Sequence, residues 1–413
     1  MINYQLTKIR QKFTQNSLKD VRGEIRKELS RFAGIIPQGS QIAVAVGSRG
    51  IDNLDIAVKE TIDFLKDKGA EPFIIPAMGS HGGATPEGQI AILRDYGITE
   101  EKMGIPVRSS MEVVEIPNEA DPDPLYMDKH AFLSDGVLMI NKIKPHTDFR
   151  GEYESGLAKM AVIGLGKEKG ALAIHQYGVY GLSELLPVAA GKILSHGKIL
   201  GGIALVENAY DETMMVRGLL AEEILLKEPG LLKIARENRP FFPAGNIDVL
   251  ILDRMGKNIS GAGIDTNIIG RIRIRGQQEP ASPVIKSIMV TDLTDESHGN
   301  ATGVGLADVV TGKLAGKIDY GVTYTNIVTS SFLERGKLPV VAYTDQDALA
   351  YSLRSCGFIQ PGEERIIRAK DTLHLDQLYV SDSIFREIQQ KENIDVIDWD
   401  VWLMDERGML NEF

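Results

Sequence analysis

The hydrophobic positions of the chain alternate between short apolar runs and segments in which apolar residues recur every three or four positions. Residues 41–46 (QIAVAV) form an apolar, partly β-branched run that is typical of a buried strand. Residues 54–68 have the spacing of an amphipathic helix, and residues 72–76 form a second short apolar run. This order predicts a strand, a helix and a strand, with the two strands parallel and joined by a right-handed crossover.

The alternation of strands and helices continues along the chain and predicts the fold class. Within residues 1–40, apolar side chains at helical spacing predict a helix. Further strands are predicted at 136–141, 203–207, 248–253, 285–291 and 338–344, and further helices at 215–237, 303–311 and 345–355. We therefore predict an α/β fold with mainly parallel sheets.

A break in this pattern predicts the domain boundary. Residues 239–245 (RPFFPAG) contain two prolines and a glycine between a helical segment and a strand. The chain has 413 residues, a length that suits two domains. We predict an N-terminal α/β domain at 1–240, a C-terminal α/β domain at 241–413, and an active-site cleft between them.

Composition excludes several classes of function. The net charge of -11 disfavours binding to nucleic acid or to anionic membranes. No apolar run is long enough to span a bilayer, and the N-terminus lacks the apolar core of a signal peptide. The only cysteine, Cys356, is interpreted as a small buried residue; it excludes a disulfide within the chain and a cysteine-rich metal site. We therefore expect a cytoplasmic protein.

Polar residues follow three of the predicted strands. Arg49, His81 and His146 each come shortly after a different strand of the predicted parallel sheet. The carboxyl ends of parallel strands share one edge of a sheet, and open α/β sheets bind their ligands at that edge. Each imidazole could act as a general acid or base, or could be a loop histidine bonded to the backbone. The carboxylate of Asp148 could orient the ring of His146.

A glycine-rich stretch, residues 141–178, contains two further candidates. Lys159 precedes the apolar run MAVIG, where desolvation would lower its pKa and make the amine nucleophilic, although its ammonium could also reach solvent. His175 could be a metal ligand or a structural histidine. Histidines without such neighbours, such as His374, are interpreted as surface residues. The glycines at 164–170 do not match the dinucleotide-binding pattern, and no zinc-hydrolase motif is present.

Four motifs surround these candidates in a fixed order. They are GSHGGAT (79–85), KPHTDF (144–149), SGLAKMAVIGLG (155–166) and ALAIHQYG (171–178). Their order and wide spacing resemble those of the nickel-pincer lactate racemases and their homologues, a family that acts on 2-hydroxy acids. The resemblance covers most of the chain and is weakest in the C-terminal third.

The resemblance implies a cofactor site. Lys159 would hold, through a thioamide, a pyridinium mononucleotide derived from nicotinic acid. His175 would complete a square-planar Ni(II) site formed otherwise by two sulfurs and one carbon of this pincer nucleotide, a geometry that suits nickel. Arg49, with the neighbouring Ser48, would bind anionic groups of cofactor or substrate. Pincer-cofactor biosynthesis enzymes would be the partners that supply the group, and recombinant protein made without them would carry a free Lys159 amine.

The resemblance also implies roles for the other two histidines. His81 and His146 would be the alternating base and acid on the two faces of the substrate carbon. A hydride would leave that carbon while one histidine takes the hydroxyl proton. The planar 2-oxo acid could then be reduced on its other face. The implied activity is a racemase or epimerase that inverts the Cα of a 2-hydroxy acid, lactate-like or larger.

The chain departs from the lactate enzymes in places that bear on the substrate. Val46 stands where those enzymes have an acidic residue, and residues 256–267 (GKNISGAGIDTN) offer no clear counterparts of the glutamine and lysine that touch lactate. Polar groups of the second domain could instead meet the hydroxyl groups of a larger substrate, such as a sugar acid, or the TDESHGN loop could be a solvated turn. These groups are Lys257, Asn258, Glu296, His298 and Asn300.

Two other functions stay open on the residues alone. One is a divalent-metal lyase or hydrolase in which His81, His146 and His175 are direct ligands. The other is a non-catalytic relative that binds a small anion. Lys159 separates the racemase from both, because neither alternative needs an amine near the metal ligand. The sequence does not identify the hydroxy acid or the oligomeric state.

Overall fold

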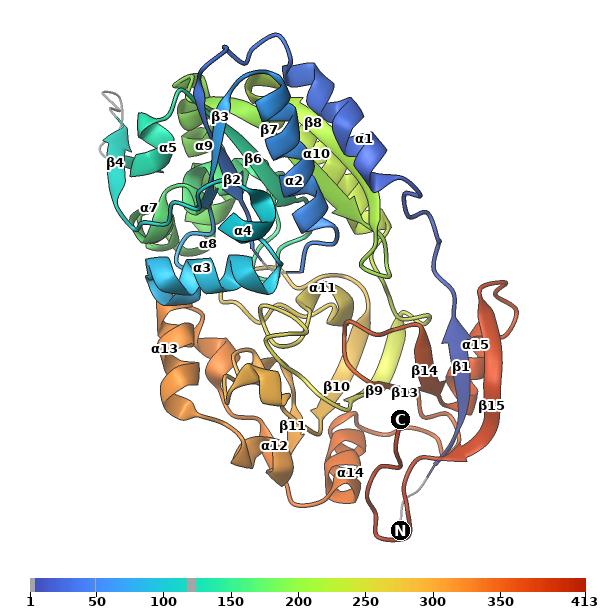
Figure 1. Cartoon of the computed structure of the whole chain (residues 1–413). Coiled ribbons are helices and arrows are strands. Elements are labelled where there is room, and N and C mark those ends of the chain that lie inside the picture. Colours follow the sequence, from blue (N-terminus) through green and yellow to red (C-terminus); the bar gives the residue numbers. More distant parts are fainter. Residues whose placement is uncertain (1–3, 49, 117–123) are drawn as a thin grey trace. The chain divides into compact units, whose positions relative to one another are not determined.

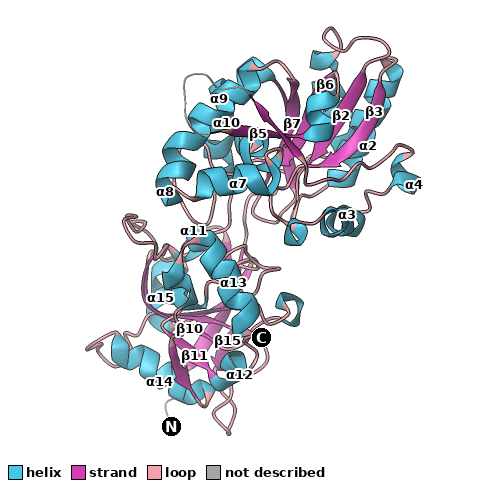
Figure 2. Ribbon diagram, turned by 90° about the vertical axis from the view of Figure 1, so that its left-hand side faces the viewer, coloured by secondary structure: helices cyan, strands magenta, loops and turns pink. Residues whose placement is uncertain are grey.

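The computed structural model describes residues 4–48, 50–116 and 124–413, which divide into two compact units (Figures 1 and 2). The first unit is Thr14–Arg239, and the second is Pro240–Phe413 together with the N-terminal segment up to Phe13. Residues Gln5–Gln11, predicted to belong to an N-terminal domain 1–240, form β1 in the second unit because they pair there with β14 (Gln377–Val380) and β15 (Ile394–Trp402).

The first unit is built on a five-stranded sheet in the order β3-β2-β6-β7-β8. Four of its strands are parallel, as predicted, and β8 runs antiparallel to β7 at the edge. The strands are β2 (Gln41–Val46), β3 (Glu71–Pro76), β6 (Gly136–Lys142), β7 (Ile199–Glu207) and β8 (Thr213–Leu220), with a separate antiparallel pair of β4 (Val113–Ile116) and β5 (Leu125–Asp128).

Helices cover both faces of this sheet. They are α1 (Val21–Leu29), α2 (Leu54–Asp67), α3 (Pro86–Asp95), α4 (Glu100–Met103), α5 (Lys129–Leu133), α6 (Leu157–Lys159), α7 (Lys167–His175), α8 (Gly178–Tyr180), α9 (Leu186–Ser195) and α10 (Ala221–Glu237). Single turns of 3-10 helix occur at Ser30–Phe32 and Gly82–Ala84, and π-helical turns at Met160–Gly164 and Gly181–Leu185.

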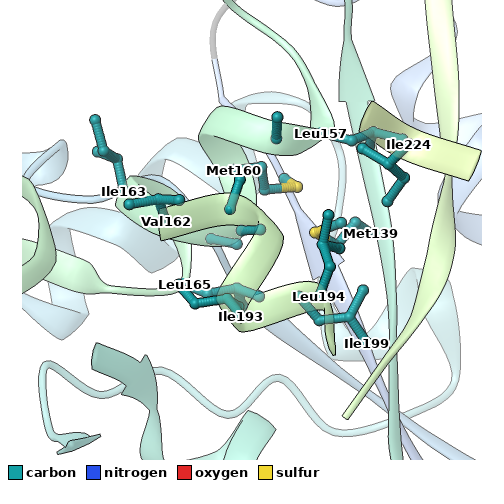
Figure 3. Packing of buried hydrophobic residues seen from close by; sticks show 14 of the residues in the cluster. Met139, Leu157, Met160, Val162, Ile163, Leu165, Ile193, Leu194, Ile199 and Ile224 are labelled. Atoms are coloured by element: carbon teal, nitrogen blue, oxygen red, sulfur yellow. The ribbon is translucent and has the colours of Figure 1, made fainter. Parts of the chain in front are cut away.

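Alternation along the strands divides the core of the first unit into two clusters. Ala43 and Ala45 of β2 face the cluster that contains α6, α7, α9 and α10. Ile42, Val44 and Val46 face the cluster that contains α1 and α2. Part of the first cluster is shown in Figure 3. Because burial of each large aliphatic side chain contributes about 2 kcal/mol, the helical segment from α6 onward is held firmly on the sheet.

Helix α10 contains a proline, so one backbone carbonyl lacks its usual partner within the helix. Pro229 lies inside the helix and has no N–H to donate to the carbonyl of Leu225, four residues earlier. The hydroxyl of Tyr153 donates to that carbonyl at 2.6 Å. The helix was predicted at 215–237, but the apolar residues 213–220 instead extend the sheet as β8.

The second unit contains an eight-stranded sheet in the order β12-β11-β10-β9-β13-β14-β1-β15. Strands β12, β11, β10, β9 and β13 are parallel, and β14, β1 and β15 continue the sheet in antiparallel pairs. The remaining strands are β9 (Asn246–Leu252), β10 (Val284–Val290), β11 (Val309–Thr311), β12 (Val340–Ala342) and β13 (Ile366–Ala369). The prediction of two α/β units with mainly parallel sheets is confirmed.

The helices of the second unit are short. They are α11 (Thr266–Ile269), α12 (Gly312–Gly316), α13 (Tyr320–Ser330), α14 (Asp345–Ser355) and α15 (Asp382–Ile388), with 3-10 turns at Asp295–Ser297, Val304–Leu306 and Leu333–Gly336. The helix predicted at 303–311 is wrong, because this segment forms a 3-10 turn followed by β11. Among all helices of the described residues, none combines the length and apolar character that a membrane span needs.

Candidate functional site

Three loops of the first unit leave the same edge of its sheet. His81 follows β3, Ser48 follows β2 and His146 follows β6, and these strands are neighbours in the order β3-β2-β6. Adjacent strands lie about 4.8 Å apart, so the loops of the two histidines leave strands roughly 10 Å apart with the Ser48 loop between them. The predicted convergence is confirmed for the two histidines. Arg49 lies outside the described residues.

The His81 loop is a tight connection between β3 and α3. Gly79 and Gly82 on either side of the histidine have φ of 62° and 66°, a left-handed conformation that favours glycine. Thr85 caps α3 by accepting the N–H of Gly88 at 3.1 Å, as predicted. The ring nitrogen Nδ1 of His81 lies 2.5 Å from the hydroxyl oxygen of Ser48. This bond fixes one side of the ring and directs Nε2 away from Ser48.

A buried carboxylate, Glu154, shapes the His146 loop. Backbone hydrogen bonds between Lys144 and Ser155 close the loop at its base. The N–H of His146 donates to Oε2 of Glu154 at 2.5 Å, and Oε1 accepts the N–H of Gly151 at 3.1 Å. Arg236 of α10 donates to the same Oε1 at 2.6 Å. Because its charge is compensated by these donors, Glu154 can remain buried and hold the backbone of His146 in place.

The ring of His146 is oriented by the backbone of Asp148. Its Nδ1 accepts the N–H of Asp148 at 3.0 Å, so the neutral ring carries its proton on Nε2. The carboxylate of Asp148, predicted to orient the ring, lies 3.9 Å from Nδ1. It is placed to pair with the ring when the ring is protonated. The ring of Phe149 lies 4.8 Å from the imidazole, centre to centre.

Lys159 ends α6 and enters a π-helical turn. Another buried carboxyl, Glu228 of α10, begins this helix by accepting the N–H groups of Leu157 and Ala158 at 2.8 and 3.0 Å. Burial raises the pKa of Glu228 to about 7. The ammonium of Lys159 lies 5.9 Å from the ring centre of Phe149. Single π-helical turns occur frequently at functional sites, and the role of this lysine stays a prediction.

His175, the last residue of α7, is electrostatically coupled to Lys159. Burial and, to a smaller extent, the ammonium of Lys159 lower the pKa of His175 to about 4, although the carboxylate of Asp148 opposes them. At neutral pH the imidazole is therefore uncharged and able to donate a nitrogen lone pair to a metal ion. The three residues are near one another, beside the His146 loop.

Replacing Lys159 with methionine is expected to raise the pKa of His175 by on the order of half a unit, because burial, the larger cause, remains. The pKa is measured from the ring ¹⁵N shifts of histidine-labelled protein. Lys169→Met is the matched control, since Lys169 is exposed on the same helix and lies over the ring of Tyr126. An unchanged pKa of His175 in Lys159→Met would show that the two groups are not coupled.

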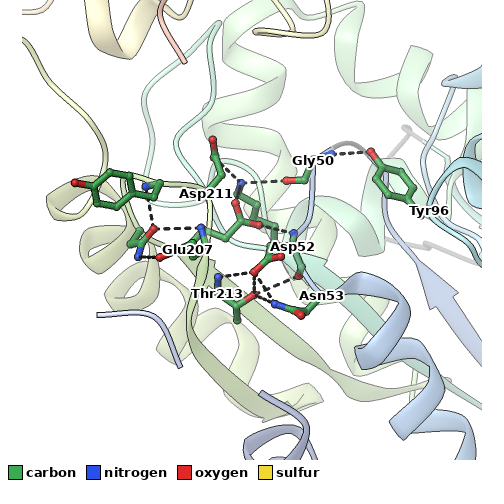
Figure 4. Close-up of polar contacts among 11 residues, drawn as sticks. Gly50, Asp52, Asn53, Tyr96, Glu207, Asp211 and Thr213 are labelled. Atoms are coloured by element: carbon green, nitrogen blue, oxygen red, sulfur yellow. Dashed lines mark hydrogen bonds and ion pairs between the residues drawn. The ribbon is translucent and has the colours of Figure 1, made fainter. Parts of the chain in front are cut away.

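A polar network fixes the loop that follows β2 (Figure 4). Lys142, at the end of β6, pairs with Glu207 and donates to the carbonyl of Gly50 at 3.1 Å. Glu207 also accepts the N–H of Asp52 at 3.0 Å. The N–H of Gly50 donates to the hydroxyl of Tyr96 at 2.6 Å. Both the carbonyl and the amide of Gly50 are therefore held, which places this end of the loop.

The candidates of the second unit lie on loops after β9 and β10. Thr294 donates to the side-chain oxygen of Asn258 at 2.7 Å and so joins the two loops. Lys257 donates to the carbonyl of Gly261 at 2.6 Å and to Asn326 of α13 at 3.0 Å. Glu296 and His298 are exposed, and Asn300 accepts two hydrogen bonds from Thr302. Their contact with a substrate stays a prediction.

His374, interpreted from the sequence as a surface residue, has a structured environment. Its Nδ1 lies 2.7 Å from Asp371, a fully buried carboxylate whose other oxygen accepts from Arg254 at 2.9 Å. The imidazole and the guanidinium hold the pKa of Asp371 below its usual range, although burial opposes them. The surface interpretation is therefore incomplete: half of the side chain is exposed, but the ring is fixed.

The described residues contain no group of three His, Cys, Asp or Glu side chains arranged to hold a metal ion. His81, His146 and His175 are thus not grouped as three shared ligands in the part of the chain that the structure describes.

The chain matches no family model and no curated protein. Its structure is distantly similar to the lactate racemase apoprotein from Thermoanaerobacterium thermosaccharolyticum, with 13% identity and a TM-score of 0.48 over 95% of this chain and 97% of that one. A protein from Thermotoga maritima is similar at 14% identity and a TM-score of 0.48, over 68% of this chain and 72% of that one. Likeness at this level carries no argument about function.

Proposed function

We propose that the chain is a racemase or epimerase of 2-hydroxy acids that binds a nickel-pincer mononucleotide. Lys159 would anchor the nucleotide covalently, and His175 would be the nickel ligand supplied by the chain. The observation that carries the proposal is the placement of this amine over Phe149, the ring that also packs against His146, with the His175 imidazole within electrostatic reach, at the sheet edge that also bears His81. Neither a simple anion-binding protein nor a hydrolase requires that combination.

The residues present fit such a group. Lys159 follows apolar, buried residues and lies over the face of Phe149, which suits an amine that becomes a neutral thioamide. His175 is uncharged at neutral pH and can therefore ligate a metal without first losing a proton. When bound, a nickel-pincer group would supply acceptance and return of a hydride at the substrate carbon.

The chain itself would move the proton of the substrate hydroxyl. One of the two histidines accepts this proton as the Cα hydrogen departs, and the other histidine donates a proton to the carbonyl oxygen when the opposite face is reduced. His146 would exchange the proton at Nε2, which requires Nδ1 to carry its own proton and to turn from the N–H of Asp148 to the Asp148 carboxylate, 3.9 Å away. His81 has Ser48 at Nδ1, so Nε2 is again the nitrogen that faces away from the fixed contact. Two opposed imidazoles suit inversion, since each serves one face of the carbon.

Intact-mass measurement tests the proposal. Protein co-expressed with pincer-making enzymes is expected to gain the mass of one mononucleotide, and Lys159→Met is expected to abolish the gain. Lys169→Met, a change to an exposed lysine of the neighbouring helix, should retain the adduct. An absent adduct in wild-type protein, or an adduct that persists in Lys159→Met, would overturn the proposed function.

A further inference from the structure

Lys167 is a fully buried lysine with no part in the proposed chemistry. It is the first residue of α7, and its side chain has no exposed surface. Its φ of 53° is left-handed, a conformation that costs a residue with a side chain on the order of 1 kcal/mol. Its ammonium pairs with the equally buried carboxylate of Asp128 at 3.1 Å. Apolar pairs often stabilise a core as well as buried ion pairs do, so stability alone does not account for this arrangement.

The ammonium of Lys167 connects three parts of the first unit. Besides Asp128, it donates to the carbonyl of Pro76, the last residue of β3, at 2.5 Å. It also donates to the side-chain oxygen of Gln89 in α3 at 3.2 Å. The ammonium thus donates two hydrogen bonds and forms one ion pair, and each of the three partners lies on a different element.

Gln89 extends these contacts to the His81 loop between β3 and α3. Its side chain is fully buried, and because its oxygen accepts from Lys167, its amide nitrogen must face the other way. That nitrogen donates to the carbonyl of Gly79 at 2.8 Å and to the carbonyl of His81 at 3.3 Å. The loop is therefore held at Pro76, where it begins, and at the histidine itself.

We propose that Lys167, through Asp128 and Gln89, is a positioning residue that keeps the His81 ring bonded to Ser48. The inference rests on the proposed role of His81 as an acid/base. The 2.5 Å contact between the ring and the serine joins two loops, so it requires a fixed backbone at His81. Without Lys167, Gln89 would lose the partner that sets the direction of its amide, and the loop would lose the restraint at Pro76.

The test uses variants that separate positioning from folding. Gln89→Met removes the two bonds to the loop and leaves the ion pair intact. Lys167→Met alone would leave a buried unpaired carboxylate, so it is combined with Asp128→Asn, which keeps the cap on Ala131 of α5. Lys198→Met is the matched control. Lys198 also donates to a backbone carbonyl, but it lies just before β7, at the amino ends of the parallel strands and so away from the His81 loop.

The readout is the ring of His81 in histidine-labelled protein whose Lys159 carries no nucleotide adduct. Long-range ¹H–¹⁵N spectra are expected to show one tautomer in wild type and in the Lys198 control. In Gln89→Met and in the double variant we expect a mixture of tautomers and a pKa of His81 shifted by at least about half a unit. In loaded enzyme, kcat should fall about 10- to 100-fold with little change in KM, because geometry rather than affinity is lost.

Two results would overturn the positioning role. One is an unchanged His81 spectrum in folded Gln89→Met and in the double variant. The other is an equal change in the Lys198 control, which would indicate a general effect of losing a bond between a lysine and a backbone carbonyl. The spectra need no cofactor, so they report separately from the proposed function: perturbed His81 spectra in a protein that never forms the Lys159 adduct would support positioning and overturn the racemase.

Discussion

Asparagine in place of His81 or His146 is expected to lower racemisation about 10³-fold, within the usual range for loss of a general acid or base. Two enantiomers have equal free energies, so kcat/KM must fall equally in both directions. The half-reactions, however, are expected to differ. With only one histidine left, the enzyme can still take the hydroxyl proton of one enantiomer and release the 2-oxo acid, but it cannot do so for the other enantiomer.

Rapid-quench measurement of the 2-oxo acid from each enantiomer checks this expectation. His81→Asn and His146→Asn should each still form the 2-oxo acid from one enantiomer, and that enantiomer should differ between the two variants. His196→Asn, at an exposed position after α9, should form it from both enantiomers. If both variants failed to form the 2-oxo acid from the same enantiomer, the result would contradict two opposed bases. In wild-type enzyme, deuterium at Cα should appear in the inverted product, whereas its exchange with solvent would indicate ordinary proton abstraction.

The second large effect concerns Glu228 and the pH dependence of stability. The pKa of this carboxyl is raised from 4.5 to about 7 in the folded chain by burial. Between these values the unfolded chain releases a proton that the folded chain keeps, so stability falls as pH rises through this range. The loss is on the order of 3 kcal/mol and is complete above pH 7. Glu228→Gln is expected to remove it.

His175 acts in the opposite direction. Its pKa is lowered from 6.5 to about 4, so its contribution to stability is lost as pH falls from 6.5 to 4. The two groups therefore offset each other in the wild-type protein between about pH 4.5 and 6.5. In Glu228→Gln the offset is absent, and stability should rise with pH over this range.

Chemical denaturation followed by circular dichroism at pH 5, 6, 7 and 8 measures how Glu228 and His175 change the free energy of unfolding with pH. The stability of Glu228→Gln relative to wild type should increase with pH, while Glu222→Gln, an exposed change on the same helix, should show no trend. Glu228→Ala should be less stable than Glu228→Gln by about 2 kcal/mol at every pH, because Leu157 and Ala158 lose their acceptor. A pH-independent difference for the glutamine variant would contradict the raised pKa.

Local pattern was sufficient for most of the parallel strands. The run 41–46 is apolar throughout because β2 lies inside the sheet with helices on both faces, and such strands are recognisable from sequence. The strand β8 was missed because its apolar residues adjoin the amphipathic pattern of α10. The strand β11 has three residues, too few to show a period. The strand β1 pairs with residues at the far end of the chain, which no local pattern reveals.

The candidate site divides in the same way. His81 and His146 followed from the rule that ligands bind at the carboxyl ends of parallel strands. The interpretation of Lys159 and His175 depended on the resemblance, because a lone lysine and a lone histidine are ambiguous. Glu154 was missed, since its role depends on which backbone amides surround it after folding.

One missed residue did carry a signal. The buried positions of α10 follow a helical period and include Ile224, Leu231 and Leu232. Glu228 occupies a position of this same buried face. A carboxyl in an otherwise apolar stripe must find donors inside the protein, and this irregularity could have marked it as a structural partner of another element.

The pairing of β1 has a consequence for synthesis of the chain. Thr7 is paired with Val380, so β1 leaves the ribosome long before its partner exists. At translation rates of about 5–20 residues per second, the strand waits roughly 20–75 s, during which the whole Thr14–Arg239 unit can fold. An exposed strand invites association with other nascent chains, and the cations Lys8 and Arg10 within β1 oppose this. The strand β1 is thus placed only after β14 has been made, and its positive charges oppose association until then.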